Sequence, residues 1–193
     1  MNTRIRNFYS FCSLTAQTFY PMGKIILNLA TSLDGFIADE DGGVDWLNDF
    51  NKPGEDYGMK RFFEQCGTAI MGAKTYEQTI SFNYWYGNMD GLVFTTRELP
   101  PLEGKSVQFI SGDPAPVIKQ LKEKKKDSWL VGGASLISQF INKNLLDELI
   151  ITIVPRLLGK GSQLCPELKG IHKLQFVENK NYKDGVIQVK YRF

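Results

Sequence analysis

The chain has 193 residues, of which 42% are hydrophobic and 23% charged, and a net charge of +2. This length suits one globular core, and the near-neutral charge gives no indication of a nucleic-acid partner. Three widely spaced cysteines and one histidine exclude a disulfide framework and a histidine-rich metal site. We therefore expect a cytoplasmic protein without a metal ion. No apolar run is long enough to span a membrane, so no membrane partner is expected.

Residues 1–21 form an N-terminal extension whose status the sequence leaves open. Two arginines precede a mixed aromatic and polar stretch that lacks the apolar core and cleavage site of a secretory signal. A lipoprotein signal ending at Cys12 would also need an apolar run before the cysteine. We predict that Met22 opens a single domain covering residues 22–193.

Strand and helix patterns alternate along this domain. Apolar runs predict strands at 24–31, 36–38, 68–71, 91–95, 107–110, 129–131 and 149–154. Helical patterns occur at 55–66, 73–79, 114–125 and 134–143. Asp184-Gly185 separates two further runs, 174–178 and 186–193, as in an antiparallel hairpin. The order predicts an α/β fold with a mixed, mostly parallel central sheet and an antiparallel C-terminal hairpin. The acidic, glycine-rich segment 39–53 is predicted to be a mobile lid.

A pair of glycines, Gly132 and Gly133, separates the strand ending at Val131 from the helix that follows. Glycine lets backbone N–H groups approach an anion, and a helix N-terminus adds positive charge and free donors. Polar or glycine residues follow several other strands, where an open α/β sheet binds its ligands: Gly72, Thr75, Thr95, Thr96, Arg97, Ser111 and Gly112. Together these residues predict a groove for a phosphate-bearing dinucleotide.

Four motifs appear in order along the domain: SLDGFIA at 32–38, IMGAKTYE at 70–77, VGGA at 131–134, and LDEL at 146–149 followed by PRLLGKG at 155–161. In these four motifs and their order, the chain resembles the dihydrofolate-reductase-like superfamily, and within it the RibD C-terminal (bacterial bifunctional deaminase-reductase) domain family. The resemblance implies a three-layer fold, an NADPH cofactor and hydride transfer to a small heterocyclic substrate.

The same resemblance implies a set of cofactor-binding residues along the strand ends. It assigns this role to Ala30, Ile37, Gly72, Lys74, Thr75, Thr95, Thr96, Arg97, Gly132, Gly133, Ala134, Ser135 and Leu136, and the polar strand ends add Ser111. The family segment usually has arginine where this chain has Ala73, a change that removes a charge selecting NADP over NAD. Lys74 or Arg97 could replace that charge, so the choice between NADPH and NADH stays open.

Two carboxylates are candidates for catalysis. Asp56 matches the acid with which dihydrofolate reductases bind the pterin ring, although it could equally favour a helix N-terminus. Asp34 precedes Gly35 beside the strand that would contact the nicotinamide, where a turn role is the alternative. Tyr57 and Trp46 could stack against a flat substrate, or belong to the core.

The implied function is an NADPH-dependent reductase of a C=N-type centre in a pteridine or ribosylaminopyrimidine-like substrate, of the kind used in riboflavin biosynthesis. The chain carries Phe36 where the riboflavin reductases commonly have lysine, and it lacks their zinc deaminase half, which favours a stand-alone branch. Alternatives are a dihydrofolate reductase proper and a non-catalytic nucleotide-binding module. The resemblance also implies a homodimer with the terminal strands at its interface.

Overall fold

The structure is a computed structural model that describes residues 22–193, so the predicted extension 1–21 lies outside the described residues. Its strands are β1 Ile25–Ser32, β2 Phe36–Ala38, β3 Cys66–Gly72, β4 Asp90–Phe94, β5 Val107–Ile110, β6 Asp127–Gly132, β7 Glu148–Val154, β8 Ser162–Gln163, β9 Gln175–Asn181 and β10 Ile187–Arg192. Its helices are the 3-10 helix η1 Asp45–Phe50 and the α-helices α1 Met59–Gln65, α2 Ala73–Ser81, α3 Ala115–Lys122 and α4 Ala134–Asn142.

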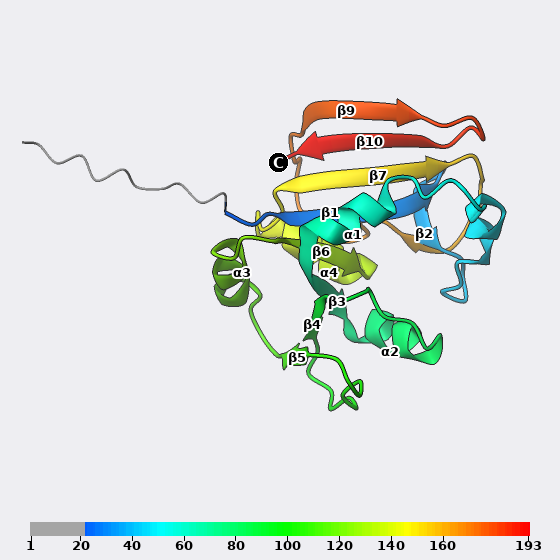
Figure 1. Cartoon of the computed structure of the whole chain (residues 1–193). Coiled ribbons are helices and arrows are strands. Elements are labelled where there is room, and N and C mark those ends of the chain that lie inside the picture. Colours follow the sequence, from blue (N-terminus) through cyan, green and yellow to red (C-terminus); the bar gives the residue numbers. More distant parts are fainter. Residues whose placement is uncertain (1–21) are drawn as a thin grey trace, which may run out of the picture.

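Eight strands form the central sheet in the order β5-β4-β3-β6-β1-β7-β10-β9 (Figure 1). The first six run parallel, while β10 is antiparallel to both β7 and β9. The predicted α/β fold with a mostly parallel sheet and an antiparallel C-terminal hairpin is therefore confirmed. Because β1 lies between β6 and β7, its carboxyl end lies at the centre of the ligand-binding edge.

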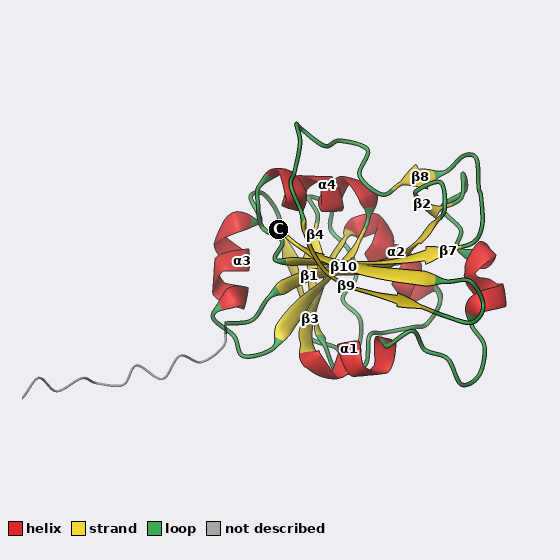
Figure 2. Cartoon of the chain, turned by 90° about the horizontal axis from the view of Figure 1, so that it is seen from above, coloured by secondary structure: helices red, strands yellow, loops and turns green. Residues whose placement is uncertain are grey.

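Helices cover both faces of the sheet, which gives three layers (Figure 2). Helices α3 and α4 pack on one face, where Ile118 and Phe140 join a cluster with Leu27 of β1. On the other face, Phe62 of α1 and Tyr76 of α2 join a second cluster. A strand between two such layers is buried on both sides, which explains the nearly continuous apolar run at the start of β1.

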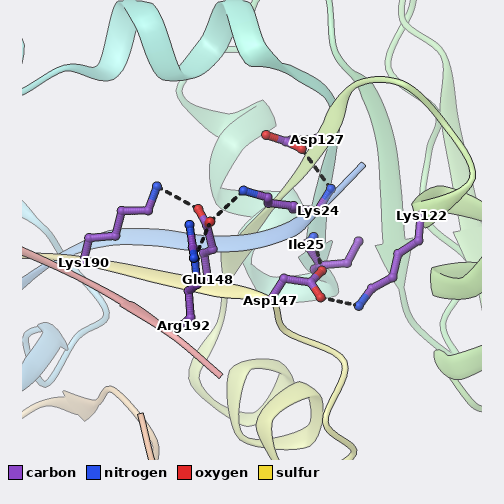
Figure 3. Close-up of polar contacts among 8 residues, drawn as sticks. All are labelled: Lys24, Ile25, Lys122, Asp127, Asp147, Glu148, Lys190 and Arg192. Carbon is purple, nitrogen blue, oxygen red and sulfur yellow. Dashed lines mark hydrogen bonds and ion pairs between the residues drawn. The ribbon is translucent and has the colours of Figure 1, made fainter. Parts of the chain in front are cut away.

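Charged side chains hold together the end of the sheet at which the parallel strands begin, opposite their carboxyl ends (Figure 3). Glu148, which is 2% exposed, lies 2.7 Å from the Lys24 ammonium and 2.8 Å from that of Lys190, with Arg192 at 3.6 Å. These contacts join the start of β1, the start of β7 and the end of β10. The cluster therefore holds the C-terminal hairpin against the parallel part of the sheet.

Two elements were not predicted, and one begins later than expected. Helix η1 and the short strand β8 gave no periodic signal because they contain six and two residues. Helix α1 begins at Met59 rather than at residue 55, because Gly58 before it has a left-handed backbone with φ 81°. Among residues 22–193 no helix is both long and apolar enough to cross a membrane.

Candidate active site

A cleft of about 1630 Å³ lies along the carboxyl ends of the parallel strands. Two neighbouring parallel strands, β3 and β6, end in Gly72 and in Gly132-Gly133, and each leads directly into a helix. Gly72 is the N-cap of α2, and Gly133 is the N-cap of α4. Two helix N-termini therefore open into the same cleft, and their N–H groups favour an anion there.

The two glycine turns approach each other closely. A Cβ atom at Gly133 would lie 3.5 Å from Thr75 Oγ1, and a Cβ at Gly72 would lie 3.9 Å from the Gly133 nitrogen. Gly132 has φ 140°, a backbone conformation that residues with a side chain rarely adopt, and the peptide bond between the two glycines is cis. Glycine at these positions therefore keeps the two turns free of side chains at the place where they meet.

We call this half of the cleft the anion end. Its residues lie at the carboxyl ends of β3 and β6, in the segments that follow β3, β4, β5 and β6, and in the segment after β8. They are Gly72, Ala73, Lys74, Thr75, Glu77, Thr95, Thr96, Arg97, Gly112, Gly132, Gly133, Ala134, Ser135, Leu136, Lys143, Glu167 and Lys169. Four cations and two carboxylates contribute to its charge. Arg97 forms a 2.8 Å ion pair with Glu77, whereas no ion pair of Lys74 is recorded within residues 22–193. Lys143 pairs with Asp113 at 3.1 Å, and Lys169, like Lys74, has no ion pair among residues 22–193, so Lys74 and Lys169 are the cations most available to an anionic ligand.

The other half, which we call the aromatic end, lies over β1 and β7. It is lined by Asn28, Ala30, Leu47, Tyr57, Met59, Tyr86, Trp129 and Thr152. Ala30 pairs with Thr152 across the β1–β7 ladder, and Thr152 Oγ1 accepts a 2.9 Å hydrogen bond from Gln188 of β10. This end offers flat apolar surfaces with few polar groups, as expected for binding a planar ring.

The predicted cofactor residues lie together, with one exception. All of them line the cleft except Ser111. Ile110 and Gly112 line the cleft on either side of it. The grouping of the others follows from the sheet order, because the strand ends on which they lie are neighbours.

Neither predicted catalytic carboxylate lines the cleft. Asp56 is exposed and accepts 2.9 Å hydrogen bonds from the backbone N–H groups of Gly58 and Lys60 at the start of α1. These bonds, that of Lys60 first, lower the pKa of Asp56 below its ordinary value. The structure therefore shows Asp56 in the helix-terminal role that the sequence left as its alternative.

Asp34 fastens a loop rather than facing the cleft. Its carboxylate accepts a 2.6 Å hydrogen bond from the Ser32 hydroxyl and further bonds from the N–H groups of Leu158 and Gly159. The bond from Ser32, followed by those from the two N–H groups, holds the pKa of Asp34 below its ordinary value. The carboxylate thus connects the turn after β1 to the loop after β7.

Of the two aromatic candidates, Tyr57 lines the cleft and Trp46 does not. Trp46 instead packs in a cluster with Phe50, Val154 and Val186. Sequence reasoning missed Asn28, Met59, Tyr86, Trp129 and Thr152. Only Asn28 carried a usable signal, because it is the polar residue inside the apolar run of β1. The other four residues look like ordinary core positions in the sequence.

Comparison with known proteins agrees with this geometry. The RibD C-terminal domain family matches residues 23–188. The uncharacterized protein YwjB of Bacillus subtilis (strain 168) is 34% identical over 165 residues, covering 84% of this chain and 94% of YwjB. A crystal structure of a putative riboflavin biosynthesis protein from Shewanella sp. PV-4 has a TM-score of 0.79 and 29% identity, covering 88% of this chain and 98% of that one.

A more distant structure shares the fold. The dihydrofolate reductase of Enterococcus faecalis, in complex with NADP(H), has a TM-score of 0.64 at 18% identity, covering 90% of this chain and 98% of that one. The family match spans most of the chain and includes both glycine turns. The chain therefore belongs to the RibD C-terminal domain family and shares the fold of dihydrofolate reductase.

Proposed function

We propose that this protein is an NADPH-dependent reductase that acts on a C=N-type centre of a pteridine or ribosylaminopyrimidine-like substrate. The observation that carries the proposal is the paired N-termini of α2 and α4, which meet across glycine turns where a Cβ would narrow the cleft. Helix N-termini commonly bind phosphate groups through their free backbone N–H groups. The neighbouring aromatic end would take the nicotinamide and the substrate ring.

The residues of the anion end fit the cofactor. Thr75, Ser135 and the N–H groups of the two helix starts would hold the pyrophosphate, while Lys74, Thr95 and Thr96 would hold the 2′-phosphate region. The backbones of Ala30 and Ile37 would flank the nicotinamide, which supplies a hydride when the cofactor is bound. With the cofactor bound, the substrate carbon would receive a hydride and its nitrogen a proton from water, so that the C=N bond would become a single bond.

Water is the proposed proton source because no carboxylate of the described chain lines the aromatic end. Tyr57 is also a poor acid there. Burial, together with its hydrogen bond to Asp184, raises the pKa of Tyr57 to about 12. The protein would contribute by orienting the two rings and by limiting access through the segment 39–53, of which Gly42, Val44 and Leu47 line the cleft.

The experiment is a thermal-shift titration with NADPH and NADH, followed by consumption of reduced cofactor with pteridine and aminopyrimidine acceptors. We expect NADPH to raise the melting temperature by several degrees at saturation. If neither cofactor raises it, the proposal fails. Cofactor binding without turnover of any acceptor would instead support a non-catalytic nucleotide-binding module.

We also propose a homodimer that forms through the terminal strands. Strand β9 is the last strand of the sheet, nearly all of its residues are exposed, and Phe176 on it is 61% exposed. An exposed edge with apolar residues is a typical site of strand pairing. Light scattering should give the dimer mass for the native chain and the monomer mass for Phe176→Glu. A monomeric native chain would overturn this proposal.

A further inference from the structure

The aromatic end differs from the rest of the cleft in its charge. Among residues 22–193, six charged residues line the cleft, and all of them lie on α2, after β4, after α4 or in the segment after β8. The residues contributed by β1, η1, α1, β6 and β7 at the aromatic end carry no charge. A ligand group seated there meets neither an ammonium group nor a carboxylate.

One polar side chain at this end is buried and poorly satisfied. Asn28 is 4% exposed, and its side-chain Nδ2 makes only a weak 3.6 Å hydrogen bond to Met59 Sδ. Within residues 22–193, no hydrogen bond to its carboxamide oxygen is recorded. Buried amides normally have partners, because an unpaired group loses its hydration without compensation. Asn28 therefore has hydrogen-bonding capacity that the folded chain leaves unused.

The fold does not need this carboxamide. The backbone carbonyl of Asn28 already accepts a 2.8 Å hydrogen bond from Trp129 Nε1, which links β1 to β6. The neighbouring position on β7 is apolar Ile150, and the flanking residues on the same face of β1 are Ile26 and Ala30. A leucine at position 28 would suit this surrounding better, so packing does not explain the asparagine.

We propose that Asn28 recognises the substrate, and that the substrate presents there an uncharged planar heterocycle with an N–H group beside a carbonyl group. This inference rests on the proposed reductase function. A carboxamide offers one acceptor and one donor side by side, which complement the acceptor and donor of a lactam edge. Thr152 adds a second polar contact: its oxygen accepts from Gln188, so its own O–H remains able to donate to a ring carbonyl.

The proposal also defines which substrates fit poorly. An amidine-type edge, as in a protonated aminopteridine, would require a carboxylate, and a phosphorylated side chain would require a cation. In the described part of the chain, neither a carboxylate nor a cationic side chain lines the aromatic end. A neutral lactam ring is the chemistry that satisfies Asn28 without burying an unpaired charge.

The test uses lumazine, a neutral pteridine-2,4-dione, as a probe in the presence of saturating NADPH. Trp129 lines the aromatic end, so quenching of tryptophan fluorescence together with calorimetry would report binding. The variant is Asn28→Leu. The matched control is Thr68→Val, which removes a buried hydroxyl from β3 at a position that is 4% exposed and does not line the cleft.

We expect Asn28→Leu to weaken lumazine binding about 10- to 100-fold, while NADPH affinity is retained and the melting temperature without ligand is equal or higher. Thr68→Val should bind lumazine as the native chain does, and 1,3-dimethyllumazine, which lacks both lactam N–H groups, should bind weakly to all three. Equal lumazine affinity of the native chain and Asn28→Leu would overturn the proposal. So would a loss of stability in Asn28→Leu with unchanged affinity, because it would assign Asn28 to the fold.

The same measurements distinguish a failure of the recognition proposal from a failure of the proposed reductase function. If NADPH shifts the melting temperature but lumazine does not bind the native chain, the reductase proposal stands and the recognition proposal fails. If NADPH itself produces no shift, the reductase proposal fails first.

Discussion

The Tyr57 hydroxyl donates a hydrogen bond to the carboxylate of Asp184, although the two residues are 127 positions apart in the chain. The backbone of Tyr57 is left-handed, with φ 51°, and its carbonyl accepts a 3.1 Å hydrogen bond from Gln188. Tyr57, at the aromatic end, is thereby fixed to the β9–β10 turn and to β10. The C-terminal hairpin thus helps to position the wall of the cleft.

This contact predicts a specific loss of stability at alkaline pH. Burial first, and then the hydrogen bond to Asp184, raises the pKa of Tyr57 from 10.0 to about 12. Because the folded pKa lies above the unfolded one, the stabilisation is complete below pH 10 and is lost as pH rises towards 12. Urea unfolding across this range should show a steeper loss for the native chain than for Tyr57→Phe. Identical pH profiles would contradict the prediction.

Asp56 is predicted to stabilise the start of α1 rather than to act in catalysis. Its two hydrogen bonds to backbone N–H groups resemble a helix cap, which alanine would remove at a cost of about 1 kcal/mol. Asparagine caps nearly as well, so Asp56→Asn should unfold like the native chain in denaturant. Both variants should keep their NADPH affinity and their turnover. A well-folded Asp56→Asn without turnover would restore the catalytic assignment.

Glu148 is predicted to be important for stability and unimportant for ligand binding, because it lies at the edge of the sheet opposite the cleft (Figure 3). Glu148→Gln leaves three neighbouring cations without their counterion and should cost about 3 kcal/mol in unfolding free energy. The control Asp49→Asn breaks an equally short but exposed contact, 2.6 Å from Arg156, and should cost less than about 1 kcal/mol. NADPH affinity should not change in either variant.

The same glutamate predicts behaviour at acid pH. Burial raises the pKa of Glu148, but hydrogen bonds and charge from Lys190 and Lys24 outweigh burial and leave the pKa below its ordinary value of 4.5. Its stabilisation is therefore present above that value and is lost as pH falls through the folded pKa. The native chain and Glu148→Gln should converge in stability on acidification. A constant difference between them would contradict this origin of the stabilisation.

Lys74 is predicted to determine the preference for NADPH over NADH. It occupies the start of α2 next to Ala73, and Arg97 nearby is already paired with Glu77. Lys74→Ala should weaken NADPH binding about 5- to 10-fold and leave NADH binding nearly unchanged. Lys119→Ala, on α3 and outside the cleft, is the control. Equal weakening of both cofactors would show that Lys74 does not contact the 2′-phosphate.

The sequence by itself determined the order of most strands and helices, the mixed sheet and the glycine turns. These features rest on local chemistry: apolar periodicity, and the backbone freedom of Gly132 and Gly133. The residues predicted to bind the cofactor lie together, Ser111 apart, because strand ends in a parallel sheet share one edge. Ser111 was the exception, because the side of a strand end that faces the cleft depends on its register with neighbouring strands.

Only the tertiary structure decided which polar groups face the cleft and which serve the fold. Asp56 and Asp34 looked catalytic in the sequence, yet nearby N–H or O–H groups bind both carboxylates. Asn28 and Thr152 looked like interior residues, yet they line the aromatic end. The reason is physical: a side chain's availability depends on partners from distant parts of the chain, and packing alone brings β1, α1, β7 and β10 together.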